Sequence, residues 1–329
     1  MRYGQLRKTL IAALAALLPC SAFAQGTASA YPNKPVRVVV GMAPGGATDI
    51  QARMFTQRMS ESLGQQFIVD NRDGAGGLLA IQAVKNSNPD GYTVLAVTTS
   101  FTVVPALHST PPYDPVKDFL PVSLVTKAPY MIIVTPSFPA KTMTEFLAYA
   151  KLKPGAINFA IPGIGTTTHL GAVWLDHSGV KVTIIPYKGA GPATMDVIAG
   201  QVNAAFASIL SGLPHVKAGR VRVVAVTTSQ RSKVLPDVPT VAESGVPGYD
   251  VDTWHGWLVA KGTPPAIVNK INMELAKAVR APEMTARLAG DGGEIVVSSP
   301  AQFSQVIIKE ITRWSMLVKA TGLKTVDQN

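Results

Sequence analysis

The chain has 329 residues, of which 47% are hydrophobic and 15% are charged, and its formal net charge is +10 at pH 7. That length and hydrophobic content suffice for two domains with cores of their own, and glycine and proline follow no period, which excludes a disordered or collagen-like chain. Lysine and arginine are scattered, so we interpret the charge as a basic surface that mildly attracts anions and not as a nucleic-acid site.

The N-terminal residues have the pattern of a secretory signal peptide. Three cations lie in the first eight residues, and the apolar run that follows, Leu10–Leu18, is too short to span a bilayer. Small residues then favour cleavage after Ala24, with Ala30 as the alternative, so we predict residues 1–24 as the leader. Without the three leader cations the chain carries a net charge of +7.

The single cysteine, Cys20, lies in the predicted leader. Because it follows Pro19, it matches a lipoprotein cleavage site poorly, and the mature chain has no cysteine for a disulfide, a thiolate or a metal. No later run reaches 18 consecutive apolar residues. We therefore expect a soluble protein that is exported to the periplasm or beyond it.

Strand-like and helix-like runs alternate along the chain, and continuous β-rich runs between helices favour parallel sheets covered on both faces. The predicted fold class is therefore α/β. In chain order the predicted elements are strand Val36–Val40, helix Thr48–Leu63, strand Phe67–Asp70, helix Gly77–Asn86, strand Tyr92–Val97, strand Met131–Thr135, helix Thr142–Leu152, strand Ile157–Ala160, helix Thr166–Ser178, strand Thr183–Pro186, helix Pro192–Ile198, strand Val202–Ala207, helix Leu213–Ala218 and strand Val221–Thr227.

The last predicted element is a C-terminal helix with clear end signals. Ser299 is a predicted N-cap, followed by Pro300 at the first helical position and by Gln302 three residues after the cap. Apolar residues at helical spacing then predict one buried face, and Gly322 ends the pattern.

A glycine-rich turn joins a predicted strand to a predicted helix in each half of the chain. The first turn is Met42–Thr48 and the second is Pro162–Thr166, and Gly74–Gly77 and Lys188–Pro192 are further turns of the same kind. Backbone N–H groups at a helix start lack intrahelical partners, and glycine lets a ligand approach them closely. Each turn is therefore a candidate anion site that needs no charged side chain.

The energetics favour a ligand that bridges two such turns. A micromolar ligand needs about 8 kcal/mol, a helix dipole gives one carboxylate at most about 2 kcal/mol, and each hydrogen bond to a charged group adds about 1.5–3 kcal/mol. A monocarboxylate on one turn would bind weakly, whereas a dicarboxylate held by one turn from each half can reach micromolar affinity.

Motifs for nucleotide binding or catalysis are missing from the sequence. The turns match neither a P-loop nor a Gly-x-Gly-x-x-Gly fingerprint, and the chain has no Gly-x-Ser-x-Gly elbow and no His-Glu-x-x-His. We expect no catalysis, cofactor or metal. His169 follows Thr166 in the first turn of a predicted helix, where it touches a bound anion or only caps and packs. For Asp49 and Asp196, near helix starts, ligand positioning and plain capping stay alternatives.

Together these motifs are similar to those of one known family. The chain resembles, over nearly its whole mature length, the substrate-binding proteins of tripartite tricarboxylate transporters, also called Bug-type solute receptors. The markers are Pro44-Gly45-Gly46-x-x-Asp49-x-x-Ala52-Arg53, Asn71-Arg72-x-Gly74-Ala75-Gly76-Gly77, Gly163-x-Gly165-Thr166-x-x-His169-Leu170, Tyr187-Lys188-Gly189-x-Gly191-Pro192-Ala193-x-x-Asp196, Leu213-Pro214-His215-Val216-Lys217-Ala218-Gly219 and Leu235-Pro236-Asp237-Val238-Pro239-Thr240-Val241-Ala242-Glu243.

The resemblance implies a two-lobed, type II-like periplasmic binding protein that closes on its ligand like a Venus flytrap. We place the two interlobe crossings near Thr126–Ala128 and Asp250–Trp254. Residues 25–126 and 251–329 would then form the first lobe, and residues 127–250 the second.

The resemblance also implies the ligand site, since the family binds small carboxylates largely through backbone amides of two loops. Carried over to this chain, the predicted ligand-binding residues are Ala43, Gly45, Gly46, Thr48, Asp49, Ser100, Gly163, Gly165, Thr166, Thr167, His169, Asp196 and Ala207.

Two positions depart from the family pattern. Ala207 stands where the family often has aspartate, and Asp73 stands where it usually has proline. An amine-bearing or water-bridged ligand that used the family's aspartate would lose that partner here. The departures bear on the ligand and not on the fold.

The sequence thus predicts a monomeric periplasmic receptor that binds a small organic acid, a dicarboxylate, and delivers it to the permease subunits of a tripartite transporter. Two alternatives stay open. One is a secreted hydrolase or isomerase that uses His169 with Thr166 or Asp196. The other is a receptor that reports to a membrane histidine kinase.

Overall fold

The computed structural model describes residues 31–290 and 292–323, so the leader predicted over residues 1–24 lies outside the described residues. The chain divides into a short unit, Met1–Asn33, and a main unit, Lys34–Asn329, which contains the whole sheet. In the part of the chain that is described, no helix is both long and apolar enough to cross a membrane.

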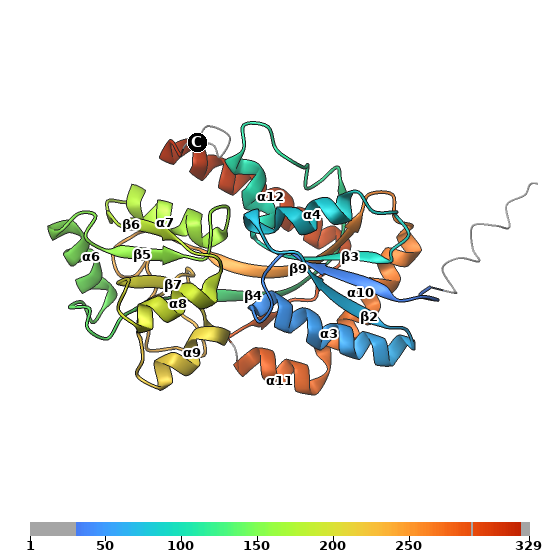
Figure 1. Ribbon diagram of the computed structural model, residues 1–329, viewed down its shortest axis with the longest axis horizontal. Coiled ribbons are helices and arrows are strands. Elements are labelled where there is room, and N and C mark those ends of the chain that lie inside the picture. Colours follow the sequence, from blue (N-terminus) through green and yellow to red (C-terminus); the bar gives the residue numbers. More distant parts are fainter. Residues whose placement is uncertain (1–30, 291, 324–329) are drawn as a thin grey trace, which may run out of the picture. The chain divides into compact units, whose positions relative to one another are not determined.

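The described strands form one mixed sheet in the order β2-β1-β3-β9-β4-β7-β5-β6 (Figure 1). Strands β10 and β8 also pair with β4. The strands are β1 (Val36–Val40), β2 (Phe67–Asn71), β3 (Thr93–Thr98), β4 (Phe119–Val134), β5 (Asn158–Ile161), β6 (Thr183–Pro186), β7 (Ala204–Ser208), β8 (Arg222–Val226), β9 (Asp252–Ala260) and β10 (Glu294–Ile295).

Strand β4 belongs to two halves of this sheet. Its residues Phe119–Pro129 pair with β9, and Tyr130–Val134 pair with β7. Figure 1 shows β4 and β9 running between the two groups of elements. We call β1, β2, β3 and β9 with the first part of β4 the first half, and β5 to β8 with the last part of β4 the second half.

The prediction of parallel sheets is correct for the strands that flank the centre and wrong for the centre itself. β1 pairs in parallel with β2 and β3, and β5 pairs in parallel with β6 and β7. β9 is antiparallel to β3 and β4, and β4 is antiparallel to β7 and β8. The two strands that join the halves therefore run against their neighbours.

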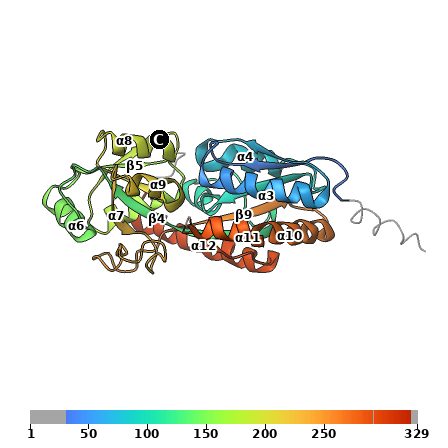
Figure 2. The same cartoon turned by 90° about the horizontal axis from the view of Figure 1, so that it is seen from below.

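Helices cover both faces of the sheet, and α10, α11 and α12 lie along one side of the main unit (Figure 2). The helices are α3 (Ala47–Leu63), α4 (Leu78–Lys85), α5 (Ser100–Val103), α6 (Met143–Leu152), α7 (Thr167–His177), α8 (Ala190–Ile198), α9 (Ile209–Lys217), α10 (Pro265–Arg280), α11 (Pro282–Gly290) and α12 (Pro300–Thr321), with 3-10 turns η1 (Ala75–Gly77) and η2 (Val104–Leu107).

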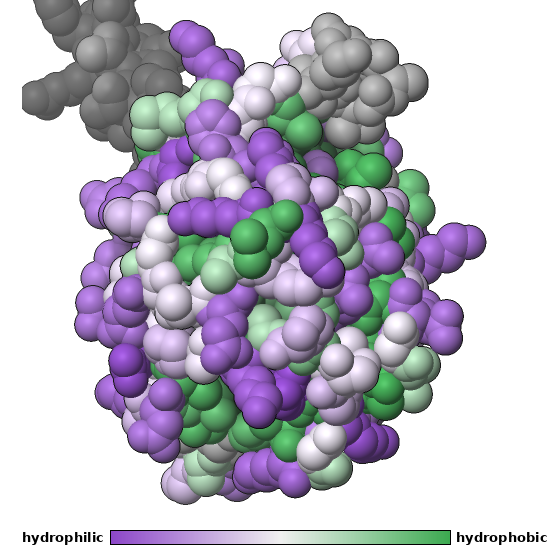
Figure 3. All heavy atoms as spheres, turned by 90° about the vertical axis from the view of Figure 1, so that its left-hand side faces the viewer, coloured by the Kyte–Doolittle hydropathy of each residue, from purple (hydrophilic) through white to green (hydrophobic). Residues whose placement is uncertain are grey.

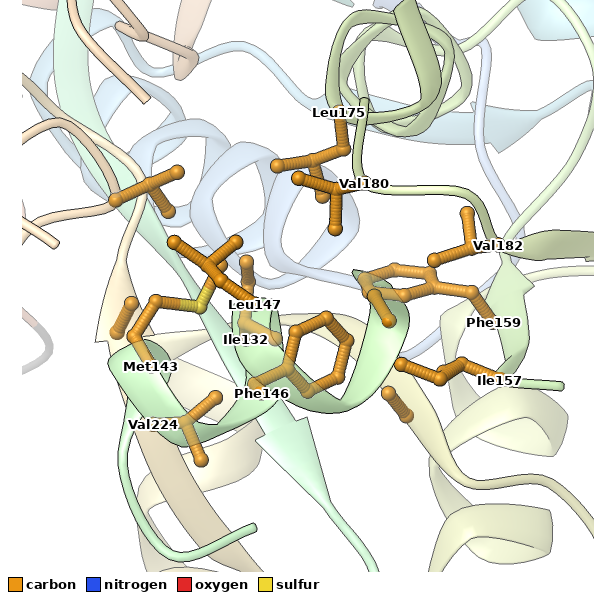
Figure 4. Close-up of a cluster of buried hydrophobic side chains, with 14 of the residues drawn as sticks. Ile132, Met143, Phe146, Leu147, Ile157, Phe159, Leu175, Val180, Val182 and Val224 are labelled. Carbon is orange, nitrogen blue, oxygen red and sulfur yellow. The ribbon is translucent and has the colours of Figure 1, made fainter. Parts of the chain in front are cut away.

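Each half has a core of its own. In the second half, Phe146 of α6 packs on Phe159 of β5 and is surrounded by aliphatic side chains from the sheet and from α7 (Figure 4). In the first half, Trp254 packs edge-to-face on Phe303 of α12. A smaller cluster joins the halves, because Leu170 of α7 packs with residues of α5, η2 and α12.

The outer surface at the α6 end of the second half is mostly hydrophilic, with hydrophobic side chains in scattered groups (Figure 3). Burial of the apolar faces of the strands and helices is what leaves this polar remainder outside.

The predicted helix ends are confirmed where local signals are strong. α12 has the capping box of Ser299 and Gln302, and it ends at Gly322 in the left-handed conformation. α8 instead begins at Ala190, because Pro192 fits the first turn, where its missing N–H is not needed. α9 begins at Ile209, because the Ser208 hydroxyl caps it.

The sequence predicted no element over most of residues 100–130 and 251–298, where β4, β9, α10 and α11 lie. Strand β4 was not predicted over most of its length because it contains Pro121 and Pro129, and proline argues against a central strand. The structure accommodates Pro121 at a register shift between β4 and β9.

Candidate functional site

A cavity of about 960 Å³ lies where the parallel strands of both halves end. It begins beside the C-terminal residues of β3, β6 and β7, which are Thr98, Pro186 and Ser208, and beside the loops after β1 and β5. Ligand sites of α/β sheets lie outside the carboxyl ends of strands, because the loops and helix starts meet there. This cavity is therefore the candidate ligand site.

The first wall is the glycine-rich loop between β1 and α3. Gly45 has φ +81°, and Gly46 is the N-cap of α3 without a side-chain cap. The N–H groups of the first helical residues, beginning with Ala47 and Thr48, consequently have no intrahelical partner. Gly45, Gly46, Ala47 and Thr48 all line the cavity, so these donors stand at its wall.

A buried carboxylate fixes the shape of this loop. Asp49 accepts hydrogen bonds from Gly45 N at 2.9 Å, Arg53 Nε at 3.1 Å and Asn71 Nδ2 at 2.9 Å, and Asn71 also donates to Met42 O. Burial alone would raise the pKa of Asp49, but the bonds from Arg53, Gly45 and Asn71 hold it below its ordinary value. The separated markers of the sequence thus form one network that holds the turn open toward the cavity.

The second wall is the loop between β5 and α7. Gly163 has φ +155° and Gly165 has φ +84°. Thr166 is the N-cap of α7: its hydroxyl donates to Gly163 O at 2.7 Å and accepts from His169 N at 3.2 Å. The N–H groups of Thr167 and Thr168 are left without intrahelical partners at the start of α7.

Further helix starts complete this wall. Gly189, Ala190 and Gly191 at the start of α8 line the cavity, as does Ser208, the N-cap of α9. Helix N-termini from both halves therefore open on one space, and each adds partial positive charge.

The turn η1 of the first half contacts the second loop directly. A Cβ added at Gly76, which has φ +68°, would lie 3.0 Å from Gly165 O. Only glycine permits this approach, and it brings the two walls together beside the cavity.

Side-chain charge contributes little to the site. Among the described residues that line the cavity, only Asp73 and Lys188 carry a formal charge, and both are exposed. Burial lowers the pKa of His255 to about 4, and burial with the charge of Arg220 lowers the pKa of His215. Both cavity histidines are therefore mainly neutral at pH 7, and the donors that the cavity offers are mostly uncharged backbone and side-chain groups.

Of the thirteen predicted site residues, the structure places seven on the cavity: Ala43, Gly45, Gly46, Thr48, Ser100, Gly163 and Thr166. The other six are not among the residues that line it. Gly165 contacts η1, and Asp49 fixes the first loop. Ala207 is 1% exposed and faces the side of β7 opposite to Phe206 and Ser208, since side chains alternate along a strand. Binding by these residues stays a prediction.

The three remaining candidates are Thr167, His169 and Asp196. Among the described residues, His169 forms no catalytic arrangement with Thr166 or Asp196. The Thr166 hydroxyl directs its proton to Gly163 O, so His169 is not placed as its base. His169 Nδ1 is buried without a hydrogen-bond partner there, and burial lowers the pKa of His169 to about 4. Asp196 accepts the Tyr187 hydroxyl at 2.6 Å, and Thr167 is 1% exposed.

The structure adds cavity residues that the sequence analysis did not select. Tyr130, Thr253 and His255 come from β4 and β9, close to the crossings predicted near Thr126–Ala128 and Asp250–Trp254. Their polar side chains beside a predicted crossing were the signal in the sequence by which they could have been identified. Tyr187 and Lys188 lie in a marker motif that was recognised but not assigned to the site.

Metal binding finds no support in the described ranges, 31–290 and 292–323, where no three His, Cys, Asp or Glu side chains gather as a metal ion requires. Hydrogen-bonding groups on backbone and side chains are what the described cavity offers a ligand.

Comparison with known proteins gives consistent matches across the chain. The family model "Tripartite tricarboxylate transporter family receptor" matches residues 51–323. The structure of the periplasmic binding protein BugD superposes with a TM-score of 0.84 at 34% identity, covering 89% of this chain and 99% of BugD.

Two similar structures contain ligands. A protein of R. palustris with adipate has a TM-score of 0.84 at 34% identity, covering 89% of this chain and 98% of that protein. MatC from Rhodopseudomonas palustris, with bound malate, has a TM-score of 0.82 at 34% identity, covering 88% of this chain and all of MatC.

Proposed function

The chain belongs to the tripartite tricarboxylate transporter receptor family, and on that premise we propose that its cavity binds a small organic dicarboxylate through backbone amides. As a member of this family the chain is a periplasmic solute-binding receptor and not an enzyme, so the hydrolase or isomerase alternative is wrong. The family resemblance and the predicted α/β fold of a periplasmic binding protein are thereby confirmed.

The observation that carries the proposal is the pair of helix starts on opposite walls of the cavity. N–H groups at the start of α3 and at the start of α7 have no intrahelical partner, and the lining is almost uncharged. One carboxylate on each start satisfies those donors. Proteins of similar structure hold adipate and malate, which are dicarboxylates.

We further propose that the two lobes predicted from the sequence move about β4 and β9 when the ligand binds. Strand pairing changes from β9 to β7 between Pro129 and Tyr130, and Val251 just before β9 still bonds to Thr227 of the second half. These points lie beside the crossings predicted near Thr126–Ala128 and Asp250–Trp254.

The test is a thermal-shift screen of the chain without its predicted leader against mono-, di- and tricarboxylates, followed by calorimetry. A ligand at 100 times its Kd adds about 2.7 kcal/mol, which raises the Tm by several degrees. Bound ligand is first removed by unfolding and refolding. A flat panel after that step would contradict the proposal.

A cavity-filling variant localises the binding. Gly191→Trp suits this purpose because Gly191 lines the cavity and a Cβ added there meets nothing within 4 Å. We expect it to weaken binding at least about tenfold. Ala301→Trp, on the exposed first turn of α12, is the matched control and should leave binding unchanged. Equal affinities for the two variants would place the ligand elsewhere.

We propose membrane permease subunits as the partner that receives the ligand. Deletion of the gene should then abolish uptake of the labelled acid into cells. Uptake that persists while the transcriptional response to the acid disappears would favour the sensor alternative instead.

A further inference from the structure

His255 lies on the part of β9 that borders the cavity, and β9 lies between β3 and β4 in the sheet. It stands opposite Thr98 of β3 and opposite Thr126 of β4. Its side chain lines the cavity although the residue is only 5% exposed. A polar ring that is this deeply buried and still borders the cavity will contact a ligand or the water that the ligand replaces.

Hydrogen bonds behind His255 fix which of its nitrogens carries the proton. The Thr126 hydroxyl donates to Gln51 Oε1 at 2.9 Å and also lies 3.1 Å from His255 Nδ1. A hydroxyl has a single proton, and here Gln51 receives it. With its proton given to Gln51, Thr126 accepts from His255, and this network assigns the ring proton to Nδ1.

His255 Nε2 is consequently a hydrogen-bond acceptor. Burial lowers the pKa of His255 to about 4, so the ring is neutral at pH 7, and a neutral imidazole has one N–H. Thr126 is 0% exposed and Gln51 is 6% exposed, so water does not compete for the Nδ1 side. Thr126 engages Nδ1 and His255 lines the cavity, so Nε2 is the ring nitrogen left for a ligand.

This acceptor restricts the chemistry of the ligand. A carboxylate oxygen is itself an acceptor and would be repelled by Nε2, so the two carboxylates belong at the helix starts. An ammonium group could donate to Nε2, but a buried ammonium also needs an anionic partner. Asp73 is the acidic residue among the described cavity-lining residues, and it is exposed. A ligand hydroxyl can donate to Nε2 and brings no charge that needs an anionic partner.

We propose that His255 Nε2 accepts a hydrogen bond from a hydroxyl group of the bound acid, so that the receptor selects hydroxy acids over the same acids without the hydroxyl. The inference rests on the proposed function, because it takes the cavity as the carboxylate site. Thr126 and Gln51 act as positioning residues that keep the proton on Nδ1.

The first experiment measures binding by calorimetry at pH 7.5 for pairs of acids that differ in the hydroxyl. Malate and tartrate are compared with succinate, and citrate is compared with tricarballylate. The acid without the hydroxyl leaves a buried acceptor unpaired. It should therefore bind at least about tenfold more weakly than the hydroxy acid of the same pair. 2-Methoxysuccinate, which keeps the oxygen and lacks its proton, should bind like succinate or more weakly.

The second experiment asks whether His255 and its tautomer cause the preference. His255→Phe removes the acceptor, and Thr126→Val removes the group that fixes the proton, so both should reduce the preference to about twofold or less. Thr126→Ser keeps the hydroxyl and should restore it. His177→Phe, at the exposed end of α7, is the control and should retain the full preference.

The outcomes separate this inference from the proposed function. Equal binding within each pair by the wild-type chain overturns the role of His255 and leaves the carboxylate site intact. A preference that survives in His255→Phe does the same. Aspartate bound more tightly than malate would replace the hydroxyl with an ammonium group. If no carboxylate binds, both proposals fail.

Discussion

Replacing Asp49 by alanine should disturb the first glycine loop more than any exposed substitution on the same helix. The side chain of Asp49 is 4% exposed and accepts from Gly45 N, Asn71 Nδ2 and Arg53. Alanine removes this acceptor from all three donors, although Asn71 Nδ2 keeps another bond, to Met42 O. The loop would lose the contact that fixes Gly45, and the α3 helix start would lose its orientation toward the cavity.

The cost can be estimated from the partners. Hydrogen bonds to a charged acceptor contribute about 1.5–3 kcal/mol each, and those from Gly45 and Asn71 are partly buried, so together they give roughly 3–6 kcal/mol. The Arg53 side chain is 54% exposed, so its ion pair adds little. In a chain of this size the Tm should fall by roughly 10 °C.

The assay is urea unfolding of Asp49→Ala beside Glu61→Gln, an exposed position on the same helix, with dicarboxylate binding measured in parallel. Arg53→Ala should cost less than about 1 kcal/mol. The pKa of Asp49 lies below its ordinary value of 3.8, so its contribution is present above that pH and is lost below it. A loss under about 1 kcal/mol for Asp49→Ala at pH 7, with unchanged binding, would refute the reasoning.

Two further predictions concern stability and closure. Unfolded histidine binds a proton near pH 6.5, whereas His255 and His169 have pKa values of about 4 in the folded chain, so the free energy of unfolding should fall as the pH drops from 7.5 to 5. His255 should account for about 2 kcal/mol of this decrease in the free energy of unfolding, as measured by urea titrations at each pH. An equally steep decrease in His255→Phe would contradict the prediction. Gly76→Ala places a Cβ 3.0 Å from Gly165 O, whereas Gly219 has the same φ of +68° with nothing within 4 Å. Gly76→Ala should therefore lower the free energy of unfolding by at least about 1 kcal/mol more than Gly219→Ala does. Of the two variants, only Gly76→Ala should weaken ligand binding, which calorimetry measures.

Local signals made much of the fold predictable. Runs of buried valine identified β1, and a serine cap with a proline and a terminal glycine identified α12. The glycine turns were found because a strand, a turn and a helix start follow one another within a few residues. Their order along the chain sufficed to recognise the family.

The central strands were not predictable in the same way. β4 contains two prolines, and β9 is buried over nearly its whole length without polar alternation, so neither has a typical strand pattern. Their antiparallel direction depends on which strands they meet, which is decided by pairing between residues more than 100 positions apart. A register shift beside Pro121 accommodates the proline in that pairing.

The same distinction between local signals and contacts of distant residues applies to the candidate site. The sequence by itself determined the two glycine loops and their helix starts, because φ values above zero and N-caps are properties of a few adjacent residues. Only the tertiary structure decided that Asp49 fixes a loop, that Ala207 faces away from the cavity, and that His255 presents an acceptor. Those outcomes depend on burial and on hydrogen bonds between distant segments, and no local pattern in the chain encodes them.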